Sequence, residues 1–120
     1  MRSFLRLCLC ALLACWPSVA SAEWVVLCFT DPSYCQPCRR LDETWKTDSV
    51  QDALRRNRCT RRIFRPSQMS SNERAVWAIT VVPTTVLVEC DEQDRVLRTI
   101  RRREGAMSSQ QLIKFLDVSE

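Results

Sequence analysis

The stretch Ser33–Arg40, with the sequence SYCQPCRR, places two cysteines two residues apart and a proline directly before the second. A C-x-x-C pair serves in proteins as a redox centre, as half of a metal site or as a structural disulfide. Three features decide among these for Cys35 and Cys38: the compartment, the other ligands in the chain and the elements that flank the pair.

The first residues have the features of a cleaved export signal in the usual order. Met1–Arg6 carries two arginines, Leu7–Trp16 is apolar, and Ala20-Ser21-Ala22 is an A-x-A cleavage site. The apolar run is shorter than the roughly 20 residues that a membrane-spanning helix needs. We therefore expect a signal peptide over residues 1–22, a domain over residues 23–120 and no membrane insertion after cleavage.

Export places the domain in the periplasm or outside the cell, where disulfides persist. A second interpretation is a lipoprotein signal, because Leu12-Leu13-Ala14-Cys15 is similar to a lipobox. The protein would then be anchored to a membrane through Cys15. The unanchored form is favoured, since Leu13 fits the lipobox poorly and the apolar run before it is short.

Charge and cysteine content narrow the class of protein further. The chain of 120 residues has 18 lysines and arginines against 14 acidic residues, and Arg2 and Arg6 leave with the signal. This near balance is not that of a nucleic-acid-binding domain, so we assign the arginines of Arg55–Arg65 and Arg95–Arg103 to a solvated helix end and an edge strand. The mature chain keeps an odd number of cysteines, so at least one thiol is free or pairs outside the chain. They are Cys28, Cys35, Cys38, Cys59 and Cys90.

The elements next to the C-x-x-C pair are a buried strand and an amphipathic helix. Glu23–Thr30 is a continuous apolar run of strand length, which is typical of a central strand covered on both faces. Cys35–Trp45 has helical periodicity, with Leu41 and Trp45 on one face and Pro37 near the start, where its missing N–H costs nothing.

The rest of the chain continues the alternation of helices and strands. Serines or an aspartate stand where helix caps are needed, at Asp48 or Ser49, at Ser70 or Ser71, and at Ser108 or Ser109. The pattern predicts helices over Val50–Asn57, Ser70–Ala78 and Gln110–Asp117, and strands over Arg61–Arg65, Val82–Cys90 and Arg95–Ile100, the last with one wet face. The order βα(α)βαββα indicates a single α/β domain.

Together these features resemble the thioredoxin superfamily over Trp24–Leu116: a strand, a C-x-x-C at a helix start, a later strand that opens with Val82-Pro83-Thr84, and a C-terminal amphipathic helix. Cys35–Asp42 and the positions after it are most similar to the C-terminal thioredoxin domain of DsbD-type periplasmic disulfide reductases and to small stand-alone relatives. The resemblance implies a thioredoxin fold, a central mixed sheet of about four strands flanked by helices.

The resemblance also assigns roles to single residues. Cys35 is the implied nucleophile, Cys38 the resolving thiol, and Pro83, preceded by Val82, a cis-proline that helps to hold the substrate backbone. From its place before the nucleophile, Tyr34 either forms a substrate-contact surface together with Val82 or has a plain packing role. Elementary chemistry agrees on the cysteines, because a helix N-terminus lowers the pKa of a thiol and the two-residue spacing lets the second sulfur reach the first.

The proton acceptor for Cys38 is a departure from the family pattern. Many thioredoxins carry a buried acid on the strand before the motif, and Trp24–Thr30 contains none; the aligned position falls near Cys28 or Phe29. Asp31 is the nearest carboxylate and is a candidate, with water as the alternative. An ordinary role in the turn before a proline is slightly favoured for it.

The remaining cysteines do not indicate a metal site. The chain has no histidine and no second C-x-x-C, whereas a closed zinc site needs four ligands. We expect Cys28 to be a buried apolar residue, and Trp45 and Trp77 to belong to the core. A Cys59–Cys90 disulfide is not favoured, because the strand from Trp24 should separate them by roughly 9.6 Å, above the roughly 7 Å limit between Cα atoms.

The sequence thus predicts an exported thiol–disulfide oxidoreductase that reduces protein disulfides through Cys35 and Cys38. It needs no cofactor. We expect a monomer whose partners are protein or peptide thiols and disulfides and a separate electron donor or acceptor, and neither nucleic acid nor metal. The alternative is a redox-silent thioredoxin-fold binding module in which the Cys35–Cys38 disulfide is structural.

Overall fold

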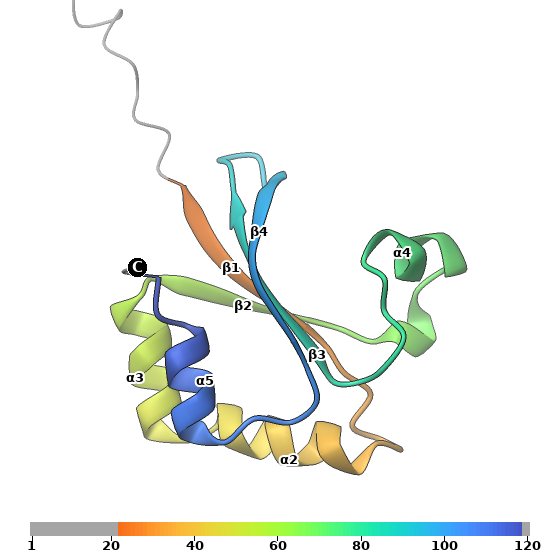
Figure 1. Cartoon of the computed structure of the whole chain (residues 1–120), viewed down its shortest axis with the longest axis horizontal. Helices are drawn as coiled ribbons and strands as arrows, with labels where there is room; N and C mark the ends of the chain where they lie inside the picture. The colour runs from red at the N-terminus through yellow and green to blue at the C-terminus, as the bar shows by residue number, and fades with distance from the viewer. Residues whose placement is uncertain (1–21, 119–120) are drawn as a thin grey trace, which may run out of the picture.

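The computed structural model describes residues 22–118 (Figure 1). The predicted signal peptide, apart from Ala22, and the lipobox at Cys15 lie outside the described residues. The strands are β1 (Glu23–Phe29), β2 (Cys59–Phe64), β3 (Thr84–Cys90) and β4 (Val96–Glu104). The helices are α2 (Gln36–Trp45), α3 (Asp48–Arg56), α4 (Ser71–Val76) and α5 (Ser109–Phe115), with a 3-10 turn η1 (Pro66–Gln68).

The four strands form one mixed sheet in the order β2-β1-β3-β4. β1 runs parallel to β2 and antiparallel to β3, and β3 runs antiparallel to β4. Val25–Phe29 of β1 are all at most 5% exposed. The predicted four-stranded mixed sheet with a central strand buried on both faces is confirmed.

Helices α2, α3 and α5 cover one face of the sheet, and α4 stands on the other side (Figure 1). The first face carries the larger core, because alternate residues of β1, Val26 and Cys28, pack there with Trp45, Leu87 and Leu112. Val25, Leu27 and Phe29 point to the other face, where the segment around α4 adds side chains that are only partly buried. A groove of about 270 Å³ stays open on that face.

Several element boundaries differ from the sequence expectation. The N-cap of α3 is Thr47 rather than Asp48 or Ser49, and α4 ends at Val76 rather than Ala78. β4 continues to Glu104, and its residues are exposed on both faces except for the partly covered Ile100 and Arg101. The prediction of a single wet face for this strand was therefore wrong, because β4 is the edge of the sheet and α4 is short.

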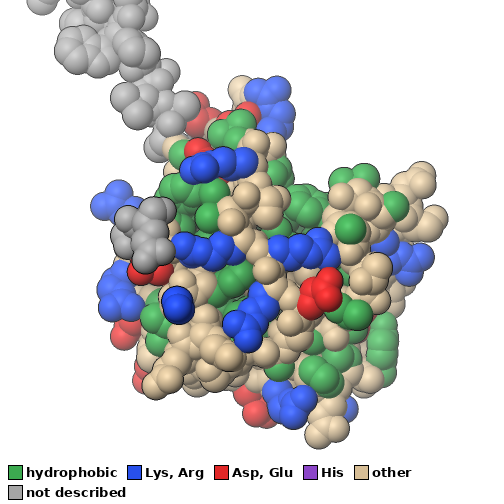
Figure 2. All heavy atoms as spheres, viewed as in Figure 1, with side chains coloured by type: hydrophobic (Ala, Val, Ile, Leu, Met, Phe, Trp, Pro, Cys, Tyr) green, Lys and Arg blue, Asp and Glu red, His purple; other side chains and the backbone are tan. Residues whose placement is uncertain are grey.

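The arginines of β4 connect this edge strand to its neighbours. Arg101 donates to backbone carbonyls at the end of α5, Arg102 donates to carbonyls that follow α4, and Arg98 pairs with Glu89 of β3. Figure 2 shows Lys and Arg side chains spread over the face that β4 crosses. The assignment of the second arginine cluster to an edge strand agrees with these contacts.

Candidate active site

The C-x-x-C pair lies at the point where the chain leaves β1 and enters α2. Cys35 is the N-cap of α2 with extended backbone angles, and its Sγ accepts the N–H of Cys38 at 3.2 Å. Pro37 stands in the first turn, where a helix has no use for the missing N–H. Cys35 and Cys38 form a disulfide with a Cα–Cα distance of 5.2 Å.

The two sulfurs differ in their access to solvent. Cys35 is partly exposed, whereas Cys38 is fully buried under the first turn of α2. A thiolate on Cys35 also faces the N-terminal N–H groups of α2 and the positive end of its dipole. Cys35 is therefore the sulfur of the pair that solvent reaches, and Cys38 is the sulfur enclosed by the fold.

The segment before β3 completes the surface around Cys35. The Val82–Pro83 peptide bond is cis, and the Val82 carbonyl oxygen lies 3.7 Å from the Sγ of Cys35. Pro83 is buried, and its carbonyl accepts the N–H of Gly105 at 2.8 Å. These contacts bring together three of the residues selected from the sequence, Cys35, Val82 and Pro83, although they lie far apart along the chain.

Two exposed apolar side chains adjoin these residues in the sequence. Tyr34, directly before Cys35, is 65% exposed, and Val81, directly before Val82, is 45% exposed. Tyr34 therefore has no packing role in the core and is free to contact a partner. Val81 was not selected from the sequence, where it is one valine in an apolar run, and only the bend before β3 brings it to the surface.

Asp31 is buried but is occupied elsewhere. Its carboxylate accepts hydrogen bonds from the Ser67 hydroxyl at 2.7 Å and from the Ser67 backbone N–H at 3.3 Å. These bonds hold the 3-10 turn η1 against the end of β1. Asp31 does not line the cavity under Cys38. The structure thus gives Asp31 an anchoring role and does not bring it together with the resolving cysteine.

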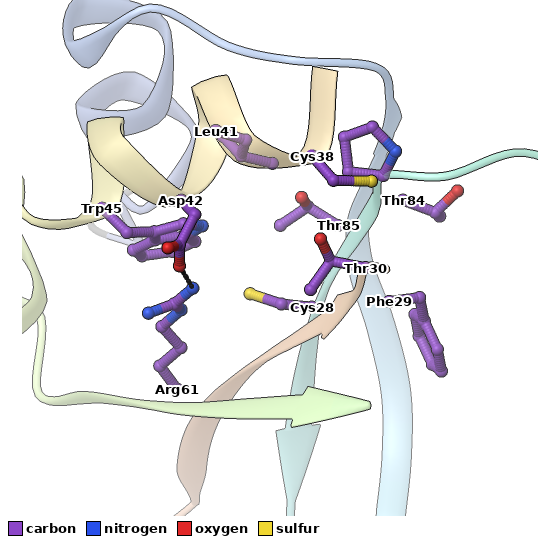
Figure 3. A pocket seen from close by; sticks show the side chains of 11 residues that line it. Cys28, Phe29, Thr30, Cys38, Leu41, Asp42, Trp45, Arg61, Thr84 and Thr85 are labelled. Carbon is purple, nitrogen blue, oxygen red and sulfur yellow. Dashed lines mark ion pairs between the residues drawn. The ribbon is translucent and has the colours of Figure 1, made fainter. Parts of the chain in front are cut away.

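A small cavity of about 10 Å³, lined by both polar and apolar side chains, lies beneath Cys38 (Figure 3). Asp42 of α2 and Arg61 of β2 enter it from two sides and form an ion pair of 3.6 Å, and the Arg61 guanidinium lies 4.5 Å from the centre of the Trp45 ring. Sequence reasoning missed both charged residues. The available signal was the spacing of Asp42, four residues after Cys38 and hence on the same helix face.

The free thiols have pKa values that keep them protonated at neutral pH. Burial raises the pKa of Cys28, an effect that the neighbouring Arg61 opposes, and burial raises the pKa of Cys59 to about 11. Burial likewise raises the pKa of Cys90. Because only the thiolate attacks a disulfide, these thiols are poorly suited to exchange.

Cys59 and Cys90 pair with neighbouring residues of β1, Trp24 and Glu23, from opposite sides. Both are free thiols, as the predicted separation by β1 requires. Within residues 22–118, no group of three or more potential ligands could hold a metal ion, and no helix has the length and apolar character needed to cross a membrane.

Comparison with solved structures gives matches in proteins of low sequence identity. Thioredoxin-2, a component of the malaria parasite protein secretion machinery, is 16% identical with a TM-score of 0.59, over 79% of this chain and 82% of that chain. A disulphide isomerase from Xylella fastidiosa Temecula1 is 17% identical with a TM-score of 0.55, over 78% of this chain and 76% of the other. Chloroplastic thioredoxin z is 17% identical with a TM-score of 0.52, over 88% of this chain and 84% of that chain.

No protein-family model and no curated protein matches the chain. The similarity to solved structures concerns the fold, and the particular resemblance to DsbD-type domains stays a prediction.

Proposed function

Because the chain has the thioredoxin fold, we propose that it exchanges thiols and disulfides with other proteins through Cys35 and Cys38. The observation that carries the proposal is the asymmetry of the pair, with an accessible sulfur at a helix N-terminus and a buried sulfur within bonding distance of it. A purely structural disulfide needs no such difference in access.

In the reducing direction the Cys35 thiolate attacks one sulfur of a substrate disulfide. The N–H of Cys38, 3.2 Å from the Cys35 sulfur, and the dipole of α2 favour this thiolate. The resulting mixed disulfide is then attacked by Cys38, which forms the Cys35–Cys38 bond and releases the substrate as a dithiol.

The substrate backbone would lie beside the segment before β3. The Val82 carbonyl oxygen lies 3.7 Å from the Cys35 sulfur, so an extended peptide bound beside this segment can donate an N–H to it. Tyr34 and Val81 would supply apolar contacts of low sequence specificity, which suits a protein that acts on many disulfides.

Reduction is the favoured direction, and export sets the site of action. Gln36 and Pro37, the residues between the cysteines, carry no charge that would strongly stabilise the thiolate and make the pair a strong oxidant. With the export signal over residues 1–22, the protein would act in the periplasm or outside the cell and would need a separate electron donor to restore the dithiol.

Insulin reduction tests the proposal. The wild type should reduce insulin with a chemical dithiol as the electron source, Cys35→Ser should be inactive, and Cys38→Ser should accumulate a mixed disulfide visible by mass spectrometry. Equal activity of the wild type and Cys35→Ser would contradict the proposal and would favour the redox-silent binding module.

A further inference from the structure

The cavity under Cys38 is surrounded by polar atoms that lack protein partners. Within the part of the chain that the structure describes, three buried side-chain polar atoms make no hydrogen bond, namely Trp45 Nε1, Arg61 Nε and Thr85 Oγ1. All three residues line this cavity, and Trp45 and Thr85 are at most 1% exposed. Buried polar groups without a protein partner are normally satisfied by ordered water, and about 10 Å³ is close to the space that one water needs.

Asp42 connects the same cavity to solvent. Its Oδ1 faces Arg61 at 3.6 Å inside, and its Oδ2 faces Lys46 at 3.3 Å on the outer side of α2. The Asp42 side chain is 36% exposed, whereas Cys38 is not exposed at all. A proton that leaves Cys38 through the cavity can therefore reach bulk water by way of this carboxylate.

We propose that Asp42 accepts the proton of Cys38 through water held in this cavity, and that Thr85 and Arg61 position that water. The inference rests on the thiol–disulfide exchange proposed above. It replaces Asp31, the candidate from the sequence, whose carboxylate is held by Ser67 and does not line the cavity.

The step follows the formation of a mixed disulfide between Cys35 and a substrate. The proton of Cys38 Sγ passes through the water to Asp42, and the thiolate attacks Cys35 Sγ. The Cys35–Cys38 bond forms as the bond from Cys35 to the substrate breaks, and the substrate leaves as a thiolate that takes a proton from solvent. The two cysteines are oxidised by two electrons and the substrate disulfide is reduced by two.

Three strands and one helix surround Cys38 and could supply the acceptor. The titratable and charged groups around it are Cys35 at the N-cap of α2, Asp42 from α2, Arg61 from β2 and Cys28 from β1, while β3 contributes Thr84 and Thr85, which do not titrate. Burial raises the pKa of Cys28, and Arg61 is a cation. Asp42 is therefore the one carboxylate among these groups.

Single-turnover kinetics separate the two chemical steps. The reduced protein is mixed with a chromogenic aromatic disulfide, so that the first release of coloured thiolate reports attack by Cys35 and the second reports attack by Cys38. The Cys35→Ser, Cys38→Ser double variant measures the reaction of the other thiols, which is subtracted. The rate of the second release is recorded over a series of pH values.

We expect Asp42→Asn to slow the second release at least about tenfold more than the first at neutral pH, since general-base catalysis typically contributes about 10²–10⁴-fold. In the variant this rate should climb with pH throughout the series, because hydroxide must take the proton. In the wild type it should depend less on pH, because the carboxylate takes the proton. Asp42→Glu should restore most of the rate. Glu43→Gln removes an exposed charge from the same helix outside the cavity and is the matched control.

Thr85→Val keeps the shape of the side chain and removes its hydroxyl, so it should slow the second release several-fold. If Asp42→Asn does not fold, this variant tests the inference in its place, and a second release at the wild-type rate in Thr85→Val would then overturn it. A second release at the wild-type rate in Asp42→Asn would overturn the inference, as would equal slowing in Glu43→Gln, or slowing in Asp31→Asn alone. Absence of the first release from the wild type would instead contradict the proposed function itself.

Discussion

At the scale of single residues, the chemistry depends on where two similar thiols are placed. Cys35 caps α2 and is partly exposed, while Cys38, one turn into the same helix, is completely buried. The same four-residue motif thus holds one accessible sulfur and one enclosed sulfur, and the proposed function assigns them the roles of external and internal nucleophile. In the proposed exchange, burial of Cys38 also creates the need for a proton acceptor inside the fold, because a thiol shielded from bulk solvent has no direct contact with it.

Tyr34 tests the proposed contact surface. Tyr34→Ala should raise the KM for a protein disulfide about 3–10-fold with little change in kcat, since tyrosine is enriched among the minority of interface residues whose truncation costs more than about 1 kcal/mol of binding free energy. Steady-state insulin reduction measures both constants. Leu97→Ala, which removes another exposed apolar side chain at the distant end of β4, should leave them unchanged. An unaltered KM in Tyr34→Ala would remove Tyr34 from the surface.

Cys35 and Cys38 could be selected from their spacing and from the helix start at which they lie, whereas Pro83 was selected only through the resemblance to thioredoxins. Sequence alone could not identify the pair of Asp42 and Arg61. The pair forms because one face of α2 meets the sheet and because the parallel register places Arg61 opposite Val26. In the sequence alone, a charged residue in either segment is interpreted as solvent-exposed.

At the scale of elements, α5 illustrates how local signals and packing combine. Ser108 caps the helix in a full capping box with Gln111, and Leu112 and Phe115 bury its inner face against the core. The serine and the apolar stripe were visible in the sequence. The contact of α5 with α3 follows only from the fold.

Leu112 should be among the residues on which stability depends most. It is fully buried in the larger core, so Leu112→Ala should lower the free energy of unfolding by about 2–5 kcal/mol through lost burial and a residual cavity. Denaturant unfolding measures the change. Ser108→Ala, which removes only the cap, should lower it by about 1 kcal/mol. A smaller loss in Leu112→Ala than in Ser108→Ala would contradict the packing described for α5.

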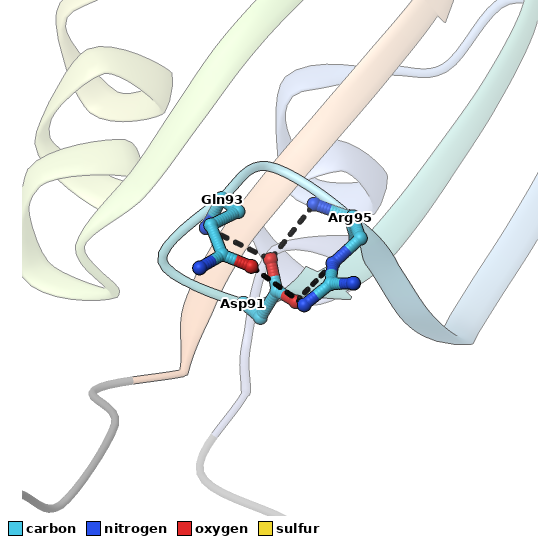
Figure 4. A network of polar contacts seen from close by, with 3 residues as sticks. All are labelled: Asp91, Gln93 and Arg95. Carbon is cyan, nitrogen blue, oxygen red and sulfur yellow. Dashed lines mark hydrogen bonds and ion pairs between the residues drawn. The ribbon is translucent and has the colours of Figure 1, made fainter.

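The turn between β3 and β4 is held by a charged network (Figure 4). The Asp91 carboxylate accepts the N–H groups of Arg95 and Gln93, both at 2.9 Å, and pairs with the Arg95 side chain. The Arg95 backbone N–H is the largest cause that lowers the pKa of Asp91 in the folded chain, followed by the Gln93 N–H and the Arg95 side chain, while partial desolvation opposes them.

A carboxyl with a lowered pKa stabilises the fold only while it is ionised. The stabilisation is complete above the pKa of the unfolded chain, about 3.9, and is lost as the pH falls through the lower folded value. Asp91→Asn should therefore lower the melting temperature at neutral pH, and the difference from the wild type should disappear in acid and shrink in high salt. Equal melting temperatures at neutral pH would contradict the network.

At the scale of the whole molecule, the alternation of apolar runs predicted the element order and the central place of β1, because both follow from burial on two faces. The exposure of β4 was not predictable in this way. Its alternating residues suit a strand with one covered face, but covering that face requires a helix longer than α4, and Phe64, Val76 and Val96 stay exposed on that side.

The most direct test of the central claim, that Cys35 and Cys38 form a working redox pair, is the redox titration of the folded protein in a series of glutathione ratios, read by thiol alkylation and mass spectrometry. We expect a single two-electron transition that is absent from Cys35→Ser. Its midpoint reduction potential should lie above about −300 mV, because the potentials of structural disulfides typically lie below that value. A Cys35–Cys38 disulfide that stays closed at every glutathione ratio would contradict the account.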